Sequence, residues 1–179
     1  LGACATQYSS EYMDVEVRRD GFRYTLHFEH GENIGGLQKE PYAKRDTGTT
    51  IRFKPDLQVF TDIAVPIDYF RDILKRQAIV NPSLVFVLRD QRGHAFETEE
   101  FVYQNGIADY VKELVGEERL TDVQVWSAER KGRDRADKPD YKVRLNVAFC
   151  FSNKVNLLEY YHNSSWLGHG GSSEKAVRC

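Results

Sequence analysis

The stretch DTGTTIRFKPD, residues 46–56, organises the rest of the sequence. It opens with a Thr-Gly-Thr turn, after which the apolar side chains of Ile51 and Phe53 alternate with polar ones, as in a β-strand. Lys54-Pro55-Asp56 then ends the strand. Taken alone, the glycine is a turn residue and Thr49 is a solvent-facing strand residue. The segments on both sides are needed to give this strand a role.

Length and composition indicate a globular protein with one large domain or two small ones. The 179 residues are 41% apolar, which is enough for a hydrophobic core. The net charge of -2 argues against a protein that coats nucleic acid by bulk charge, but it leaves room for a local basic patch.

Three cysteines, Cys4, Cys150 and Cys179, are widely spaced and odd in number, which predicts reduced thiols in a cytoplasmic protein. No apolar run approaches the roughly 20 residues of a membrane span, and no signal peptide is visible. The sequence starts with Leu1 in the middle of a pattern and ends inside a predicted helix. We therefore expect a segment of a longer protein and no membrane partner.

A β-hairpin is predicted ahead of the 46–56 stretch. Apolar residues alternate along 12–19 and again along 22–29, and the Asp20-Gly21 pair between them is typical of a two-residue turn. Residues 1–10 resemble a glycine-led turn entering a short helix, which is either a phosphate site or simply a packed helix. Residues 30–45 are polar and predict a loop with at most a short edge strand.

The histidines of this region do not predict a metal centre. His27 and His30 have no carboxylate or cysteine at ligand spacing, so we interpret them as surface residues.

A second unit begins near Pro66, where apolar residues recur at helical spacing until Asn81-Pro82. Residues 84–88 form a nearly continuous apolar run, which predicts a strand buried on both faces. Further elements are predicted as a strand over 95–103, a helix over 107–115, strands over 123–129 and 141–152, and a helix from about 173. In the 141–152 strand, the expected inward set is Val143, Leu145, Val147, Phe149 and Phe151.

The segment between the last two strands is basic. Residues 130–144 carry seven basic side chains against three acidic ones, and the basic ones are Arg130, Lys131, Arg133, Arg135, Lys138, Lys142 and Arg144. This segment is either a surface that contacts DNA phosphates or a solvated hairpin loop.

Six stretches are similar, in order and spacing, to the B subunit of bacterial type IIA DNA topoisomerases, the gyrase B family. The matching stretches are Leu1-Gly2-Ala3, VEVRRDG at 15–21, the 46–56 strand, residues 70–90, residues 101–115, and Phe151-Ser152-Asn153 with Gly170-Gly171. The resemblance covers most of the chain.

The resemblance implies an α+β fold in two parts. Residues 1–56 would be the C-terminal part of a GHKL ATPase domain, 57–65 a connection, and 66–179 most of a transducer domain with a ribosomal-S5-like βαβ fold. In the family, backbone N–H groups of the lid bind the triphosphate, and Leu1 and Gly2 match these positions. Thr49 matches the threonine that reaches adenine, partly through water.

Two further positions match the apolar lining of the base site, Ala3 and Ile51. The implied cofactors are ATP and Mg, with most ligands outside this chain, and no catalytic residue is implied within it, so hydrolysis by this chain alone is not expected. The implied partners are DNA, the topoisomerase A subunit and a second copy of the B subunit through the ATPase clamp. The residues implied to face DNA are Arg130, Lys131, Arg133, Arg135 and Lys138.

The sequence also departs from the family. Extra residues lie between Asn153 and Gly170, including Tyr160, Tyr161 and Trp166, and Ser-Ser follows Gly-Gly where Thr-His is common. These departures leave open a gyrase, a decatenating topoisomerase or a specialised paralogue. A non-enzymatic βαβ module that binds nucleic acid or protein through residues 130–144 is the alternative function, and a mismatch-repair ATPase fits the sequence less well.

Overall fold

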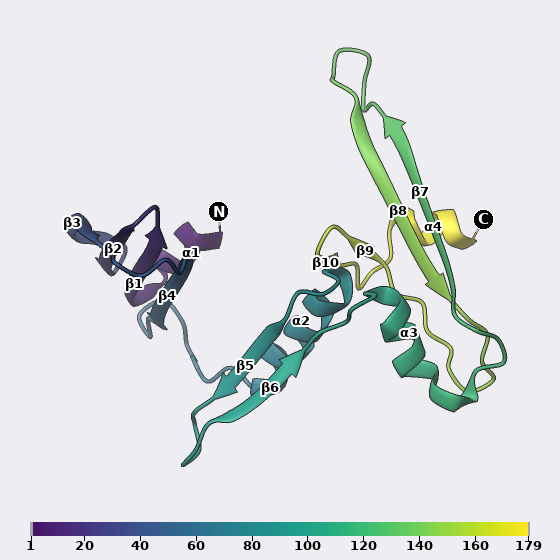
Figure 1. The fold of residues 1–179 in the computed structure, drawn as a ribbon, viewed down its shortest axis with the longest axis horizontal. Helices are drawn as coiled ribbons and strands as arrows, with labels where there is room; N and C mark the ends of the chain where they lie inside the picture. The colour runs from purple at the N-terminus through teal and green to yellow at the C-terminus, as the bar shows by residue number, and fades with distance from the viewer. Residues whose placement is uncertain (1, 179) are drawn as a thin grey trace. The chain divides into compact units, whose positions relative to one another are not determined.

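The computed structural model describes residues 2–178. The chain divides at the Val65–Pro66 bond into two compact units, here called unit 1 and unit 2 (Figure 1). Each unit is described by itself.

Unit 1 is a four-stranded antiparallel sheet with one short helix among its described residues. The helix α1 spans Gly2–Tyr8, and the strands are β1 (Ser10–Arg19), β2 (Phe22–Glu29), β3 (Glu32–Pro41) and β4 (Gly48–Pro55). They lie in the order β3-β2-β1-β4, and α1 lies against β1 and β4. The hairpin and the 46–56 strand predicted from the sequence are thus confirmed.

Two hairpin turns are built from left-handed residues. Asp20 and Gly21 join β1 to β2 with φ values of 53° and 76°, which is the geometry of a two-residue turn that matches strand twist. His30 and Gly31 repeat this device between β2 and β3, with φ values of 47° and 85°.

The structure corrects the sequence prediction for residues 30–45, which was a loop with at most a short edge strand. These residues form the ten-residue edge strand β3, every residue of which is exposed. Because neither face of β3 is covered, its composition stays polar and lacks the alternation that reveals a half-buried strand. Its pairing with β2 shifts register between Thr25 and His27.

A buried carboxylate fixes the exit of β4. Asp56 is only 7% exposed, and its backbone N–H donates to the carbonyl of Ser9 at 3.0 Å. Its side chain accepts the backbone N–H of Gln58 at 2.8 Å and lies 2.8 Å from Nδ1 of His30. The N–H of Gln58 lowers the pKa of this carboxyl, burial opposes that change, and His30 adds to it. One side chain thereby links the end of β4 to the β2–β3 turn and, through its backbone, to the start of β1.

Unit 2, as described over residues 66–178, contains four helices and three antiparallel hairpins. The helices are α2 (Ile67–Val80), α3 (Ile107–Val115), the short 3-10 turn Gly116–Glu118 and α4 (Ser172–Arg178). The hairpins pair β5 (Phe86–Asp90) with β6 (Glu97–Phe101), β7 (Gln124–Gly132) with β8 (Tyr141–Phe149), and β9 (Tyr161–His162) with β10 (Ser165–Trp166).

The core of unit 2 forms where α2 meets the β5–β6 hairpin and α3. Ala78, Ile79 and Tyr103 are buried there, and partly buried apolar residues pack around them: Val80, Phe86, Phe101, Ile107 and Tyr110. The apolar stripe of α3 predicted from the sequence is therefore a packing face.

Two predictions about buried strands were wrong. The run 84–88 does not form a strand buried on both faces, because the strand starts at Phe86 and Leu84, Val85 and Val87 are 44–51% exposed. In β8, Leu145, Val147 and Phe149 are 39–47% exposed and do not point into a core, and Phe151 beyond the strand is 62% exposed. Both strands belong to two-stranded ribbons, and a ribbon presents two faces that the described residues cover only in part.

The hairpin that carries the basic residues is longer than predicted. β7 runs to Gly132, so Arg130 and Lys131 belong to the strand, and the loop is confined to residues 133–140. Because unit 2 pairs its strands only as hairpins within residues 66–178, the S5-like βαβ arrangement stays a prediction.

No described helix has the length and apolar character needed to span a membrane. Within residues 2–178, no group of three or more His, Cys, Asp or Glu side chains is placed to hold a metal ion. Cys4 and Cys150 are free thiols, and Cys179 lies outside the described residues.

We predict that Gly106→Ala destabilises unit 2 by about 1–3 kcal/mol, because its φ is +57° and a Cβ would lie 2.9 Å from Cγ of Pro82 and 3.0 Å from the carbonyl of Ile79. Gly93→Ala is the control, since a Cβ there meets only an oxygen of Ala95 at 3.9 Å. Chemical denaturation followed by tryptophan fluorescence reports on unit 2, which contains Trp126 and Trp166. Equal stability of the two variants would contradict the prediction.

Candidate functional site

The strand register of unit 1 places Thr49 and Ile51 on one face of the sheet. Thr49 pairs with Val17, and Ile51 pairs with Val15, so these residues share a face across β1 and β4. The same face extends over β2, and its apolar members are Met13, Val15, Val17, Tyr24, Leu26, Phe28, Ile51 and Phe53. Met13 is buried, whereas Ile51 is 50% exposed. The result is a partly open apolar surface with one threonine hydroxyl at its edge.

The helix α1 carries two more of the predicted site residues. Gly2 and Ala3 are exposed in its first turn, and the helix lies against β1 and β4. Leu1, the remaining predicted residue, lies outside the described residues. The structure thus places four predicted residues on two neighbouring elements of unit 1.

The Thr-Gly-Thr turn is anchored by an arginine that no sequence pattern marked as functional. The guanidinium of Arg18 pairs with Asp46, and its Nη1 lies 3.4 Å from the hydroxyl of Tyr42. A Cβ on Gly48 would lie 3.2 Å from Nη2 of Arg18, so the glycine leaves room for this side chain. A concavity of about 300 Å³ adjoins the anchor, between the β1–β2 turn and residues 42–47.

The opposite face of the same sheet is polar. Thr50 and Arg52 of β4 share it with side chains of β1 and β2, around a shallow concavity of about 460 Å³. His27 lies there between two carboxylates, with Nδ1 2.7 Å from Asp14 and Nε2 3.3 Å from Glu29. The hydrogen bond with Asp14, followed by that with Glu29, raises the pKa of His27 above its ordinary value.

In the sequence pattern, His27 has no carboxylate at ligand spacing, whereas the structure places Asp14 and Glu29 beside it. Asp14 is its cross-strand partner in the β1–β2 register, a relation that becomes visible only once the turn is placed. Within residues 2–178, His27 belongs to no group of three or more His, Cys, Asp or Glu side chains that could hold a metal ion.

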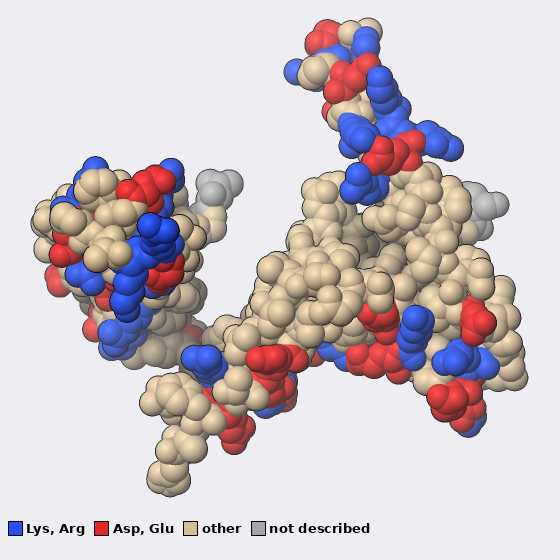
Figure 2. Space-filling view, in the orientation of Figure 1, with Lys and Arg blue, Asp and Glu red and all other residues tan. Residues whose placement is uncertain are grey.

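The basic residues of the 130–144 segment lie along the outer end of the β7–β8 hairpin, where Figure 2 shows basic and acidic side chains together. All five residues predicted to face DNA are exposed. Part of this charge is neutralised locally, because Arg133 pairs with Asp140 at 2.6 Å. Lys131, Arg135 and Lys138 form no ion pair within residues 2–178, so their charges stay available at the tip.

Farther from the tip, Glu129 is matched by two cations. It pairs with Lys142 at 2.6 Å and with Arg144 at 2.7 Å, and these partners lower the pKa of Glu129. Lys142 and Arg144 are therefore held in ion pairs with Glu129, whereas Lys131, Arg135 and Lys138 form no ion pair with a described residue.

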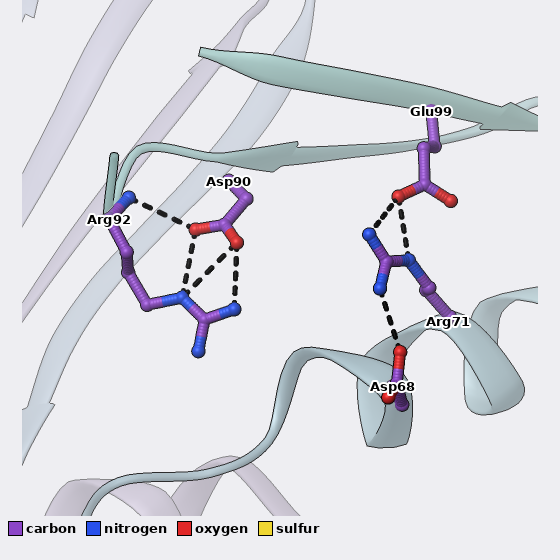
Figure 3. A network of polar contacts seen from close by, with 5 residues as sticks. All are labelled: Asp68, Arg71, Asp90, Arg92 and Glu99. Atoms are coloured by element: carbon purple, nitrogen blue, oxygen red, sulfur yellow. Dashed lines mark hydrogen bonds and ion pairs between the residues drawn. The ribbon is translucent and has the colours of Figure 1, made fainter. Parts of the chain in front are cut away.

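A polar network fixes α2 to the β5–β6 hairpin and is absent from the sequence-based predictions (Figure 3). Arg71 of α2 donates from Nε to Glu99 of β6 at 2.6 Å and from Nη1 to Asp68 at 2.7 Å. Beside it, Asp90 accepts from Arg92 at 2.7–3.1 Å, including the backbone N–H of Arg92. The side chain of Arg92, and then its backbone N–H, lower the pKa of Asp90 to about 2.

The chain is similar in sequence to the B subunits of bacterial topoisomerases. The chain is 34% identical over its full length to the B subunit of DNA gyrase from Synechocystis sp., of which it spans 16%. It is 29% identical over 91% of its length to the B subunit of DNA topoisomerase 4 from Staphylococcus aureus, of which it spans 24%. No family model matches the chain.

Solved structures of topoisomerase ATPase domains also resemble this chain. A crystal structure of the 43K ATPase domain of Thermus thermophilus gyrase B, in complex with an aminocoumarin, matches 75% of this chain and 36% of its own chain, with a TM-score of 0.62 and 29% identity. The topoisomerase IV ATP-binding domain of Francisella tularensis shares the fold over 70% of this chain, with a TM-score of 0.55 and 23% identity. The α+β fold class expected from the sequence, of the GHKL type, is thereby confirmed.

We predict that Arg92→Ala raises the pKa of Asp90 from about 2 toward its ordinary value of 3.8, because the largest stabilising partner of the carboxylate is removed. Arg89→Ala, at an exposed neighbouring position, is the control and leaves this pKa unchanged. Carbon-13 NMR of the carboxyl group measures the titration.

The lowered pKa of Asp90 also makes the stability of the folded protein depend on pH. A carboxylate with a folded-state pKa below its unfolded value contributes stability above pH 4, and that contribution is lost as the pH falls toward 2. Arg92→Ala therefore weakens the dependence of unfolding on pH between 4 and 2. An Asp90 that titrates at the same pH in wild type and Arg92→Ala would contradict the assignment.

Proposed function

Because this chain is homologous to a segment of the B subunits of DNA gyrase and topoisomerase IV, we propose that it forms part of the ATP-binding subunit of a type II DNA topoisomerase. The observation that carries the proposal is the match over the whole chain, which the likeness to a gyrase B ATPase domain supports. In this function, ATP binding and hydrolysis drive clamp closure and DNA strand passage. The subunit acts with DNA, with the A subunit and with a second copy of itself.

The proposal assigns the nucleotide to the apolar face of unit 1. A flat adenine ring suits a surface with Ile51 on the sheet and the small side chain of Ala3 on α1, and the Thr49 hydroxyl can both donate and accept a hydrogen bond. Backbone N–H groups at Gly2 suit a phosphate. We assign no Mg ligand to this chain.

The proposal assigns DNA to the tip of the β7–β8 hairpin. Lys131, Arg135 and Lys138 are exposed there without ion pairs among the described residues, which suits contacts to phosphates. The same observation supports the second candidate function, a binding module that contacts nucleic acid without using ATP.

We predict that Thr49→Ala weakens binding of a non-hydrolysable ATP analogue about three- to tenfold, the effect expected for removal of one hydrogen bond. The measurement is calorimetry on a chimera in which this chain replaces the matching segment of the Thermus thermophilus 43K domain. Thr50→Ala is a matched control, because Thr50 is the adjacent residue on the opposite face, paired with Glu16.

Both variants should unfold at the temperature of the parent chimera, since both threonines are exposed. Equal affinity of the Thr49→Ala and Thr50→Ala chimeras would contradict the assignment of the nucleotide to this face. A folded parent chimera that fails to bind the analogue, in a chain that still binds DNA, would favour the second candidate function.

We predict that a triple alanine variant at Lys131, Arg135 and Lys138 binds duplex DNA more weakly and reduces the slope of log affinity against log salt by roughly 3, at about 0.9 for each phosphate that is no longer neutralised. Fluorescence anisotropy of labelled DNA over a salt series measures both. A triple alanine variant at Lys44, Arg45 and Lys112, which are exposed elsewhere, removes the same charge and keeps the slope. Equal changes in the two triple variants would mean that only net charge matters.

A further inference from the structure

Residues 159–168, here called the strap, fold back onto α2 in unit 2. The strap contains β9, β10 and the turn between them, in which Asn163 has a φ of 53°. It belongs to the stretch in which the sequence departs from the gyrase B family. The strap also has hydrogen bonds of its own. β9 pairs with β10, and the N–H of Leu167 donates to the carbonyl of Tyr160 at 2.8 Å.

Two adjacent residues of α2 hold the strap. The guanidinium carbon of Arg76 lies 3.6 Å from the ring centroid of Trp166, which is a close cation–π stack. Gln77 donates from Nε2 to the carbonyl of Ser164 at 2.8 Å. Gly168 permits the stack, since a Cβ there would lie 2.8 Å from the indole ring.

An acidic residue at the start of the strap connects it to tyrosines. Glu159 accepts the hydroxyl of Tyr161 at 3.0 Å and lies 3.9 Å from Nη1 of Arg76. Burial, and then the charge of Glu159, raise the pKa of Tyr110 on α3 to about 12. Glu159 therefore connects the strap to Arg76 of α2, and its charge acts on Tyr110 of α3.

The docking is imperfect. Nη1 of Arg76 and the hydroxyl of Tyr160 are buried and form no hydrogen bond with any described residue. Tyr160 thus lacks a hydrogen-bond partner for its hydroxyl, and Nη1 of Arg76 has only its 3.9 Å ion pair with Glu159, so both gain hydrogen bonds to water when the strap is undocked. Trp166 is 46% exposed even when docked, so little apolar area opposes the opening.

Just before the strap, residues 151–154 are held by hydrogen bonds and an ion pair, whereas Leu157 and Leu158 have no regular structure. Lys154 pairs with Glu118, and the N–H of Leu120 donates to Phe151 at 2.8 Å, which holds residues 151–154 on the segment after α3. Leu157 and Leu158 follow without regular structure and are about half exposed. They are placed to serve as a hinge.

We propose that the strap is a latch that opens on α2 without unfolding of unit 2, and that Arg76 holds it closed. Opening frees Arg76, Gln77 and Tyr110 and changes the position of residues 159–178, α4 included, relative to α2. The proposal does not depend on the proposed function of the chain. It assigns a conformational role to residues that the sequence alone marks only as extra to the family pattern.

The test is amide hydrogen exchange on the full 179-residue chain, in the wild type and in Arg76→Gln. Glutamine keeps helix propensity but removes the charge and the stack. We expect about tenfold faster exchange at the strap amides, Leu167 among them, and unchanged exchange in α3 and the β7–β8 ladder. Arg71→Gln is a matched control on the same helix, because Arg71 binds Glu99 and not the strap.

Two further readouts separate a latch from general loosening. Strap exchange in the wild type should be insensitive to low denaturant concentrations, as local opening is, whereas core amides respond to denaturant. In a Trp126→Phe background, quenching of Trp166 fluorescence by acrylamide should increase in Arg76→Gln and not in Arg71→Gln. Strap amides that exchange only with global unfolding, or rates that are equal in wild type and Arg76→Gln, would overturn the proposal.

Discussion

The register of β1 with its two neighbours is the constraint on which unit 1 depends. Side chains alternate between the faces of a sheet, so a shift of one residue would move Thr49 and Ile51 to the polar face and Arg52 to the apolar one. The turn at Asp20-Gly21 fixes the pairing on one side of β1, and the Arg18–Asp46 and Asp56 anchors fix β4 at both of its ends. The apolar face, the polar face and the His27–Asp14 pair all follow from that alignment.

Much of the fold could be predicted from sequence, and the failures have physical causes. Alternation reveals which side chains of β1, β2 and β4 share a face, so the common face of Thr49 and Ile51 follows from their spacing. It does not reveal whether anything covers that face, which is why the expected burial of β8 was wrong. A strand with no covered face, such as β3, has no alternation to detect. Contacts such as Arg71–Glu99 join residues far apart in sequence and require the tertiary fold.

Charge is distributed in this chain more unevenly than its net value of -2 suggests. In unit 2, Lys142 and Arg144 are held in ion pairs with Glu129 and Arg133 with Asp140, whereas Lys131, Arg135 and Lys138 form no ion pair with a described residue. In unit 1, charged side chains gather on one face of the sheet and leave the other face apolar. The surface on the hairpin therefore depends on which cations form ion pairs, whereas the apolar face of unit 1 depends on the strand register, and the composition of the chain could not have located either surface.

The irregular strand β3 has a consequence for solubility. An exposed edge strand offers unpaired backbone groups to other chains, and association through such edges leads to aggregation. β3 carries consecutive glycines at 35 and 36 with φ values of 79° and 69°, the side chain of Asn33 accepts the N–H of Gly36, and the pairing with β2 shifts register nearby. These features, with the charges of Lys39 and Glu40, prevent a straight partner strand from aligning along this edge. The polar segment with the weakest strand pattern thereby protects the sheet against extension into larger assemblies.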